Sequence, residues 1–305
     1  MRDPRPVFVA ITAADGHLGS METPPFGQSM TLEPLVRRVL ATNPSAFTYT
    51  GTQTYIVGQG EVAVIDPGPD LPEHVDAILA AVAGERVAAI LCTHTHRDHS
   101  PASRAVAAAT GAPIIGCAAL AIEDGGPRSD AAFDADYAPD RVLANGEPLG
   151  GPGWTLTAVA TPGHTSNHLC FALEESGALF TGDHVMGWST SVVSPPDGDM
   201  TAYLASLELL LAREDRVFYP AHGEPVDNPR RLVRGMLGHR KQREGQILRL
   251  LAEGPQQIPA MVTKMYAGLD ARLHGAAGRS VLAHLIDLER RGAVRAEGDA
   301  WQRVA

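Results

Sequence analysis

The stretch His94-Thr95-His96-Arg97-Asp98-His99 decides how this sequence is interpreted, and it comes just after the apolar run 87–91. Four side chains that can bind a metal therefore leave the end of a predicted buried strand together. Burying several imidazoles and a carboxylate without partners would cost free energy, whereas a divalent cation satisfies all of them. The stretch predicts a zinc-type metal site at the end of a strand.

Three further candidate ligands occupy the same kind of position, in the loop just past a short apolar strand. They are His164, Asp183 and His222. Ligands that converge on one point are expected on loops held by a rigid strand scaffold. A set of His and Asp without Cys suits zinc, manganese or iron better than a thiolate site. Seven such residues fit two metals that share one carboxylate.

Size and composition indicate a globular protein. The 305 residues suffice for one large domain plus a small one, and the 44% hydrophobic content argues against a disordered chain. No apolar run reaches about eighteen residues, and the N-terminal run 7–11 is short for a secretory signal, so we expect a cytoplasmic protein that does not enter a membrane. Cys92, Cys117 and Cys170 are scattered, which argues against disulfide scaffolding.

The net charge of −10 is unevenly distributed along the chain. Residues 1–224 hold 27 acidic and 11 basic side chains, whereas residues 225–305 hold 8 acidic and 14 basic ones. This asymmetry predicts a domain boundary near residue 225. The basic excess beyond it indicates either an anionic partner or a solvated basic helix face.

The order of apolar runs predicts an α/β protein. Two runs joined by a short Gly turn predict a hairpin from 54–57 and 62–65. Helical spacing predicts helices at 73–83, 100–109 and 201–212. Further strands are expected at 87–92, 114–115, 154–160, 169–173, 178–181 and 217–220.

We divide the chain into three parts. Residues 1–45, which include a Pro- and Thr-rich stretch, are expected to form an extension that packs on the main domain. Residues 46–225 form the predicted catalytic domain, and residues 226–305 a smaller C-terminal domain. The Asp-, Gly- and Pro-rich stretch 123–140 is typical of a loop.

Several short motifs together resemble the metallo-β-lactamase fold superfamily. They are HTHRDH at 94–99, TPGH at 161–164, TGD at 181–183, AHG at 221–223 and IDPG at 65–68. The resemblance implies an αββα sandwich with the site at one edge. It also implies a first metal on His94, His96 and His164, a second on Asp98, His99 and His222, and Asp183 as the bridge between them.

The resemblance also implies a chemistry. Two Zn²⁺ ions, with Mn²⁺ or Fe as alternatives, would hold a metal-bridging hydroxide that acts as nucleophile, and Asp98 would take a proton during its attack. Lactam-cleaving subclasses with a Cys ligand place it where this chain has Asp183, so Asp183 argues against them. A bridging Asp is similar to thioesterases and RNA-processing nucleases of the superfamily.

The stretches 188–190 and 194–199 resemble the subgroup of these hydrolases that carries a C-terminal winged helix, in which an activity on single-stranded RNA is described. Helices are predicted at 240–251, from 258, and at 281–290, followed by a two-stranded wing at 292–299. Arg279, Arg290, Arg291 and Arg295 are suitable phosphate partners. Such modules also serve as packing or dimer surfaces, so an oligomer is an alternative.

The remaining histidines and one aspartate have two possible roles each. Asp66 and His168 are candidates to orient metal ligands, although Asp66 could equally be a turn residue and His168 a satisfied core histidine. His184 is expected to point away from the centre or to line the pocket. His17, His74, His239, His274 and His284 are expected at the surface or on helices.

The sequence leaves several functions open. A binuclear metal-dependent hydrolase, acting on single-stranded RNA, is the main hypothesis, and a glyoxalase II-like hydrolase of a small-molecule thioester or ester is the runner-up. A mononuclear iron dioxygenase would leave Asp98 and His99 without metal. A nucleic-acid-binding regulator with a structural metal is a further alternative, although structural zinc is normally closed by four ligands.

Overall fold

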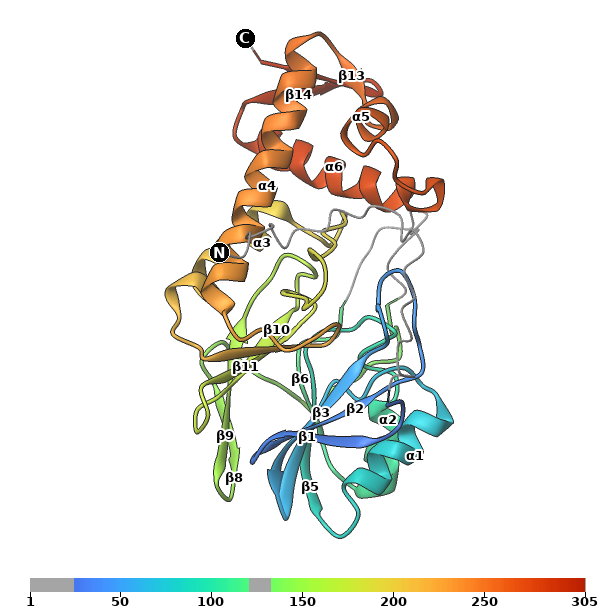
Figure 1. The fold of residues 1–305 in the computed structure, drawn as a ribbon, viewed down its shortest axis with the longest axis vertical. Coiled ribbons are helices and arrows are strands. Elements are labelled where there is room, and N and C mark those ends of the chain that lie inside the picture. The colour runs from blue at the N-terminus through green and yellow to red at the C-terminus, as the bar shows by residue number, and fades with distance from the viewer. Residues whose placement is uncertain (1–24, 121–132, 305) are drawn as a thin grey trace, which may run out of the picture.

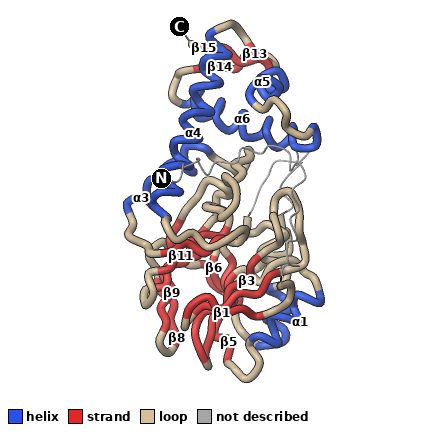
Figure 2. The backbone as a smooth tube through the Cα atoms, in the orientation of Figure 1, coloured by secondary structure: helices blue, strands red, loops and turns tan. Residues whose placement is uncertain are grey.

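Two β-sheets packed face to face form the larger part of the molecule, and a small helical domain stands at one end (Figures 1 and 2). The computed structural model describes residues 25–120 and 133–304. The first part of the predicted extension, with His17, and most of the stretch predicted as a loop at 123–140 lie outside these residues. Within the described residues, no helix combines the length and the apolar character needed to cross a membrane.

The first sheet has seven strands in chain order, antiparallel from β1 to β4 and parallel from β4 to β7. Its helices α1 (Pro72–Ala81) and α2 (Ser103–Thr110) connect parallel strands and cover its outer face. The strands are β1 (Ser29–Glu33), β2 (Val36–Leu40), β3 (Gln53–Gln59), β4 (Glu61–Ile65), β5 (Arg86–Cys92), β6 (Ile114–Gly116) and β7 (Arg141–Val142).

The second sheet has five strands in the order β12-β11-β10-β9-β8, and only β11 and β12 run parallel. Helix α3 (Met200–Ala212) makes that parallel connection and is capped at its N-terminus by Asp199, whose carboxylate accepts the N–H of Ala202. The strands are β8 (Pro148–Gly151), β9 (Trp154–Ala160), β10 (Leu169–Leu173), β11 (Ala178–Gly182) and β12 (Val217–Pro220).

Strands with apolar residues on both faces explain the continuous hydrophobic runs of the sequence. Along β10, Leu169, Phe171 and Leu173 pack between the two sheets, whereas Cys170 and Ala172 pack under α3. Successive side chains of a strand point to opposite faces, so a strand in a central layer must be apolar at every position. The αββα arrangement expected from the sequence is therefore confirmed.

Residues 29–40 differ from the prediction, because they form β1 and β2 of the first sheet rather than a draped extension. In β2, Val36 packs between the sheets and Val39 packs under the outer helices. Arg37 and Arg38 interrupt this apolar pattern, and Arg37 donates to the carbonyl of Ala81 at the end of α1. Because of these two arginines, the sequence lacks the continuous apolar run that predicts a buried strand.

The C-terminal domain contains α4 (Pro229–Ala252), α5 (Ile258–Met265), the short helix η1 (Ala271–Leu273), α6 (His274–Arg290) and a small sheet of β13 (Gln256–Gln257), β15 (Ala300–Arg303) and β14 (Val294–Glu297). Helix α4 belongs to both domains: Val233 and Met236 pack with α3, whereas Ile247 and Leu251 pack in the C-terminal core. Figure 1 shows it rising from α3 into the upper domain. The predicted boundary near residue 225 therefore precedes a continuous helix rather than a linker.

Candidate metal centre

The seven residues that the sequence singled out lie together at one edge of the sandwich. Each follows the carboxyl end of a strand, namely β5, β9, β11 or β12. They form two groups that share Asp183, and within each group the candidate ligand atoms lie within 4.8 Å of one another. One group is His94, His96, His164 and Asp183, and the other is Asp98, His99, Asp183 and His222.

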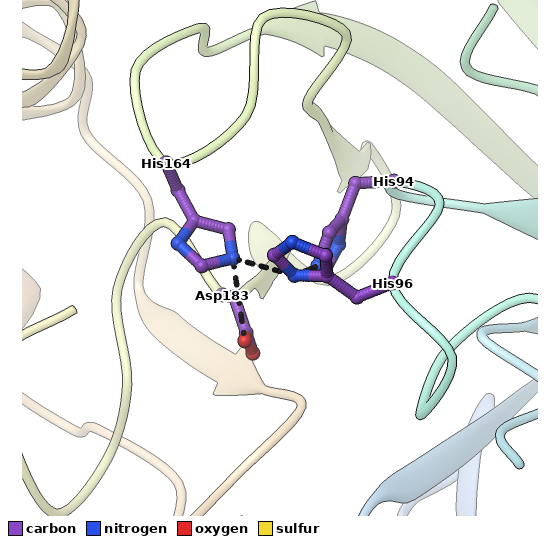
Figure 3. A group of neighbouring side chains, drawn as sticks. All are labelled: His94, His96, His164 and Asp183. Atoms are coloured by element: carbon purple, nitrogen blue, oxygen red, sulfur yellow. Dashed lines mark hydrogen bonds and ion pairs between the residues drawn. The ribbon is translucent and has the colours of Figure 1, made fainter. Parts of the chain in front are cut away.

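In the first group, the ring nitrogens of three histidines point toward one another (Figure 3). The Nδ1 atom of His96 lies 2.9 Å from Nε2 of His94 and 3.1 Å from Nε2 of His164. The Oδ2 atom of Asp183 lies 3.6 Å from Nε2 of His164. His96 thus faces this group with its Nδ1 atom, whereas the other two histidines use Nε2.

The second group surrounds the other carboxylate oxygen of Asp183. Oδ1 of Asp183 lies 3.3 Å from Nε2 of His222 and 3.5 Å from Nε2 of His99. Oδ2 of Asp98 lies 3.2 Å from Nε2 of His222. The side chain of Asp98 is 28% exposed, whereas those of His99 and His222 are fully buried, so this group opens to solvent beside Asp98.

Protein oxygens hold the opposite nitrogen of four of these rings, which fixes how each ring is turned. The ring of His164 donates from Nδ1 to the carbonyl of Val192, at 2.6 Å. The ring of His222 donates from Nδ1 to the carbonyl of Gly51, at 3.1 Å. Nδ1 of His94 lies 3.0 Å from the hydroxyl of Thr93, and Nδ1 of His99 lies 3.0 Å from Oδ2 of Asp66.

Asp66 is 2% exposed and contacts His99 of the second group directly and His94 of the first group through Thr93. Its carboxylate accepts the backbone N–H and the hydroxyl of Thr93 as well as the ring N–H of His99. Its φ of 48° places it in the left-handed region, which Asp tolerates better than most residues. Of the two roles considered for Asp66, the structure gives it the contact with a candidate ligand.

His168 is a buried histidine with both ring nitrogens bonded. Its Nε2 accepts the backbone N–H of Asp183 at 3.2 Å, and its Nδ1 therefore donates to the hydroxyl of Thr161 at 2.8 Å. Burial lowers the pKa of His168 well below its ordinary value, in keeping with a neutral ring. It is thus a satisfied core histidine that also supports the loop carrying Asp183.

Gly182 precedes Asp183 in the same tight loop. Its φ is +49°, and a Cβ atom there would lie 2.7 Å from both Nε2 of His168 and the hydroxyl of Thr93. Any larger residue would push apart the side chains that support the centre. The TGD motif therefore needs its glycine for close packing.

Opposite charges in the second group shift its pKa values in opposite directions. Burial would raise the pKa of Asp98 and Asp183, but His99 and His222 outweigh it and lower both. Burial would lower the pKa of His99 and His222, but the carboxylates of Asp98 and Asp183 outweigh it and raise both. The two carboxylates are thus held ionised.

The pKa shifts in the first group all run downward. Burial and neighbouring imidazoles lower the pKa of His94 well below its ordinary value, and burial lowers that of His96 to about 3. These rings stay neutral across the physiological range. Each therefore keeps a lone pair on one nitrogen.

Two of the histidines expected at the surface or on helices, His74 on α1 and His284 on α6, do lie on helices, and both are buried, at 1% and 2% exposure. His74 packs against Thr54, with Nε2 2.8 Å from its hydroxyl. The helical spacing alone does not reveal this contact. His184, beside Asp183, is fully buried and packs on the ring of Tyr203.

Three of the four arginines expected to bind phosphate make contacts within the chain. Arg279 donates to the carbonyl of Pro195 at 2.9 Å, and Arg290 pairs with Asp199. Arg291 pairs with Glu244 and Asp287. These side chains already bind the protein, so the basic excess of the C-terminal domain is partly used internally. The prediction of a nucleic-acid contact remains a prediction.

An aromatic surface beside His222 was missed in the sequence. The ring of Tyr49 stacks on that of Trp188, with centroids 5.0 Å apart, and Tyr49 is 41% exposed with a φ of 56°. Residues next to Tyr49 and Trp188 contact His222. The carbonyl of Gly51 accepts the ring N–H of His222, and the N–H of Gly187 donates to the backbone carbonyl of His222. Non-glycine residues at positive φ are uncommon and often lie at functional sites.

Gly187 holds Trp188 in place because its backbone packs directly on the segment after His222. A Cβ atom at Gly187 would lie 2.0 Å from the carbonyl oxygen of Glu224, closer than any real side chain approaches. The only sequence signal for this arrangement is an isolated glycine beside a tryptophan, which by itself is weak.

Comparison with known proteins places this fold and site in a family. Residues 48–222 match the metallo-beta-lactamase superfamily, and residues 258–301 match the beta-lactamase associated winged helix domain. A lactamase-like protein of Pestalotiopsis fici is 32% identical over 274 residues, which cover 85% of this chain and 80% of that protein. An atrochrysone carboxyl ACP thioesterase of Aspergillus terreus is 33% identical over 256 residues, covering 78% and 74%, and other fungal relatives carry the same name.

A solved beta-lactamase domain protein from Burkholderia ambifaria has the same fold, with a TM-score of 0.77 at 20% identity over 94% of this chain and 96% of that one. The resemblance inferred from the motifs is confirmed for both the catalytic and the winged-helix parts. The chain belongs to the metallo-beta-lactamase superfamily and carries the winged helix domain associated with it.

Proposed function

We propose that this protein is a binuclear metal-dependent hydrolase that cleaves a thioester. The observation that carries the proposal is the pair of donor groups that share Asp183 and open to solvent beside Asp98. Structural zinc sites are normally closed by four ligands, so a shared carboxylate and an open side favour a catalytic centre.

The residues fit two divalent cations. Nε2 of His99, Nε2 of His222 and Oδ1 of Asp183 are buried and make no hydrogen bond within the described part of the chain. Such atoms are costly to bury, and a cation bound between them would satisfy all three. The donors are imidazole nitrogens and carboxylate oxygens, which suits zinc, with manganese and iron as alternatives. We assign His94, His96 and His164 to one cation, Asp98, His99 and His222 to the other, and Asp183 to both.

When bound, the two cations would supply a water that ionises near neutral pH and a Lewis acid for the substrate carbonyl. Water adds to the acyl carbon, the carbon–sulfur bond breaks, and the products are a carboxylate and a thiol. Asp98 is the partly exposed carboxylate of the centre, so we assign it the proton that the attacking water gives up. The neutral rings of His94 and His96 act as ligands and not as proton carriers.

Two observations support a thioester as substrate. Relatives that align over most of this chain are named as thioesterases acting on a carrier-bound acyl group. The exposed ring of Tyr49, stacked on Trp188, offers an apolar surface of the kind that an acyl group would cover. Asp183 at the bridging position also agrees with the thioesterases of the superfamily.

The test is hydrolysis of acyl thioesters by the purified protein, followed by release of the free thiol, with metal content measured on the same sample. We expect two ions per chain and turnover that is lost in Asp183→Asn, because that residue serves both groups. Asp76→Asn on the exposed face of α1 is the matched control and should keep full activity.

Other outcomes of this assay would redirect the proposal. Metal-dependent cleavage of end-labelled single-stranded RNA without thiol release would assign the centre to a nuclease. A single iron per chain would favour the mononuclear dioxygenase. Full thioester turnover by Asp183→Asn would refute the shared role of this residue.

A further inference from the structure

The C-terminal domain is joined to the catalytic domain by side chains that cross between them. The hydroxyl of Thr201 donates to Asp287 at 2.7 Å, and Ala283 of α6 packs in the core under α3. In Figure 1, α6 crosses above the loops that follow the strands of the second sheet. The most deeply buried of the crossing charged groups is Arg240 on α4, which is 3% exposed.

The guanidinium of Arg240 has unusual partners for a buried charge. It donates to the carbonyl of Ser191 and, at 3.5 Å, to the hydroxyl of Ser280, and it lies 5.1 Å from the centre of the Tyr203 ring. No carboxylate is among its contacts in the described part of the chain. Arg213 on the surface and Arg291 at the domain edge, in contrast, each pair with an acid. Burying a cation among neutral groups costs free energy, so we expect the contacts of the Arg240 guanidinium to have a structural role.

The segment that Arg240 holds reaches both sides of the first metal group. The carbonyl of Val192, the residue after Ser191, accepts the Nδ1–H of His164. The hydroxyl of Ser191 donates to the carbonyl of His184, the residue after Asp183, at 2.9 Å. Residues 191–192 therefore touch one candidate ligand directly and lie one residue away from another.

The hydroxyl of Tyr203 donates to the same carbonyl of His184 at 3.1 Å, and the ring of Tyr203 is the one that lies beside Arg240. Two routes thus lead from one side chain of α4 to the loop that carries Asp183. The histidine rings of the second group are held by Asp66 and Gly51 instead, so Arg240 reaches that group only through the shared Asp183.

We propose that Arg240 is a positioning residue through which the C-terminal domain sets the orientation of His164 and hence the metal affinity of the first group. This inference rests on the proposed function in one respect, namely that the two groups bind metal. It makes the winged helix domain part of the construction of the centre, whatever else that domain binds. The second group shares only Asp183 with the first, so it should depend on Arg240 less than the first group does.

The test measures Zn²⁺ affinity by competition with a chelator in two backgrounds, each retaining one group. His222→Ala leaves the first group intact, and His96→Ala leaves the second. Arg240→Met keeps the apolar stem and removes the guanidinium. Because partners of metal ligands are typically worth 10- to 100-fold in affinity, and Arg240 acts one step further away, we expect about tenfold weaker binding in the His222→Ala background. In the His96→Ala background we expect a clearly smaller change, because only the shared Asp183 is reached there.

Two further variants make the result decisive. Arg234→Met, on the exposed face of the same helix, should leave both affinities unchanged. Arg240→Lys keeps a donor for the Ser191 carbonyl and should recover part of the loss, and it replaces Arg240→Met if that variant does not fold. Equal weakening of both groups, or of neither, would overturn the inference. A wild-type protein that binds no metal would overturn the proposed function itself.

Discussion

Replacing Asp66 by Asn changes one atom beneath the candidate metal centre and leaves the backbone free to keep its conformation. Asp66 has a φ of 48°, and Asn adopts this left-handed region as readily as Asp. The replaced oxygen would be Oδ2, which accepts both the hydroxyl of Thr93 and the ring N–H of His99. The other oxygen would stay in place to accept the Thr93 backbone N–H.

The substitution should turn hydrogen-bond donors into acceptors on both sides of the centre. An amide NH₂ in place of Oδ2 donates, so His99 must accept at Nδ1 and carry its proton on Nε2, the atom that faces the second group. The hydroxyl of Thr93 must also accept, and its own proton then turns toward Nδ1 of His94, at 3.0 Å. His94 would likewise carry its proton on the atom that faces the first group. The single amide therefore favours a proton on one ligand nitrogen in each group, and a protonated nitrogen has no lone pair for a metal.

The expected magnitude follows from these contacts. Loss of a partner that orients a metal-bound histidine typically costs 10- to 100-fold in affinity, or about 1.4–2.7 kcal/mol, and here each group loses one. Asp66→Ala would add about 1–2 kcal/mol of backbone strain, because Ala tolerates the left-handed region poorly. Without metal, Asp66→Ala should therefore be less stable than Asp66→Asn, and this difference in stability distinguishes the two variants.

The assay is chelator competition for Zn²⁺ with both groups present, together with the ring nitrogen chemical shifts of the histidines. Thr93→Val removes only the hydroxyl and should weaken the first group while sparing the second. Asp70→Asn, exposed in the same loop, is the control without effect. Two ions bound at wild-type affinity by Asp66→Asn would refute this account of how the rings are oriented.

Four other substitutions test separate parts of the structure. Burial lowers the pKa of His74 from 6.5 to about 4, so its contribution to stability is present above pH 6.5 and is lost as the pH falls toward 4. In urea unfolding, the free energy of unfolding of the wild type should therefore fall by about 2.5 kcal/mol more between pH 7 and 4.5 than that of His74→Gln. Identical pH profiles of the two proteins would contradict this. Gly187→Ala should destabilise the protein by about 1–3 kcal/mol in the same assay, because its Cβ would meet the carbonyl of Glu224 at 2.0 Å. Gly245→Ala, in the open interior of α4, should instead stabilise the protein by about 0.5–1 kcal/mol. Trp188→Ala should raise KM about tenfold for long-chain acyl thioesters but little for acetyl thioesters, since the ring offers apolar surface to a long acyl chain. Equal effects on both substrates would exclude Trp188 from acyl binding.

Most strands and the candidate ligands could be predicted from local patterns. The expected strands 154–160, 169–173 and 217–220 agree with β9, β10 and β12, because short and mostly apolar runs indicate strands with at least one buried face. His94, Asp183 and His222 each follow such a run, so the end of a strand and the position of a ligand are visible together. Edge strands were harder, because β2 mixes arginines with its apolar residues.

Short motifs in the sequence predicted the seven candidate ligands and, through the family that they resemble, the αββα class and the winged helix, because each motif consists of residues that are close together in the chain. Tertiary structure alone decided what orients those residues. His164 and His222 are held by the carbonyls of Val192 and Gly51, and every residue type carries a carbonyl, so no pattern of side chains identifies which one will be used. Tertiary structure also decided that Arg240 is buried against the loop beside the centre, because that contact joins positions 49 residues apart.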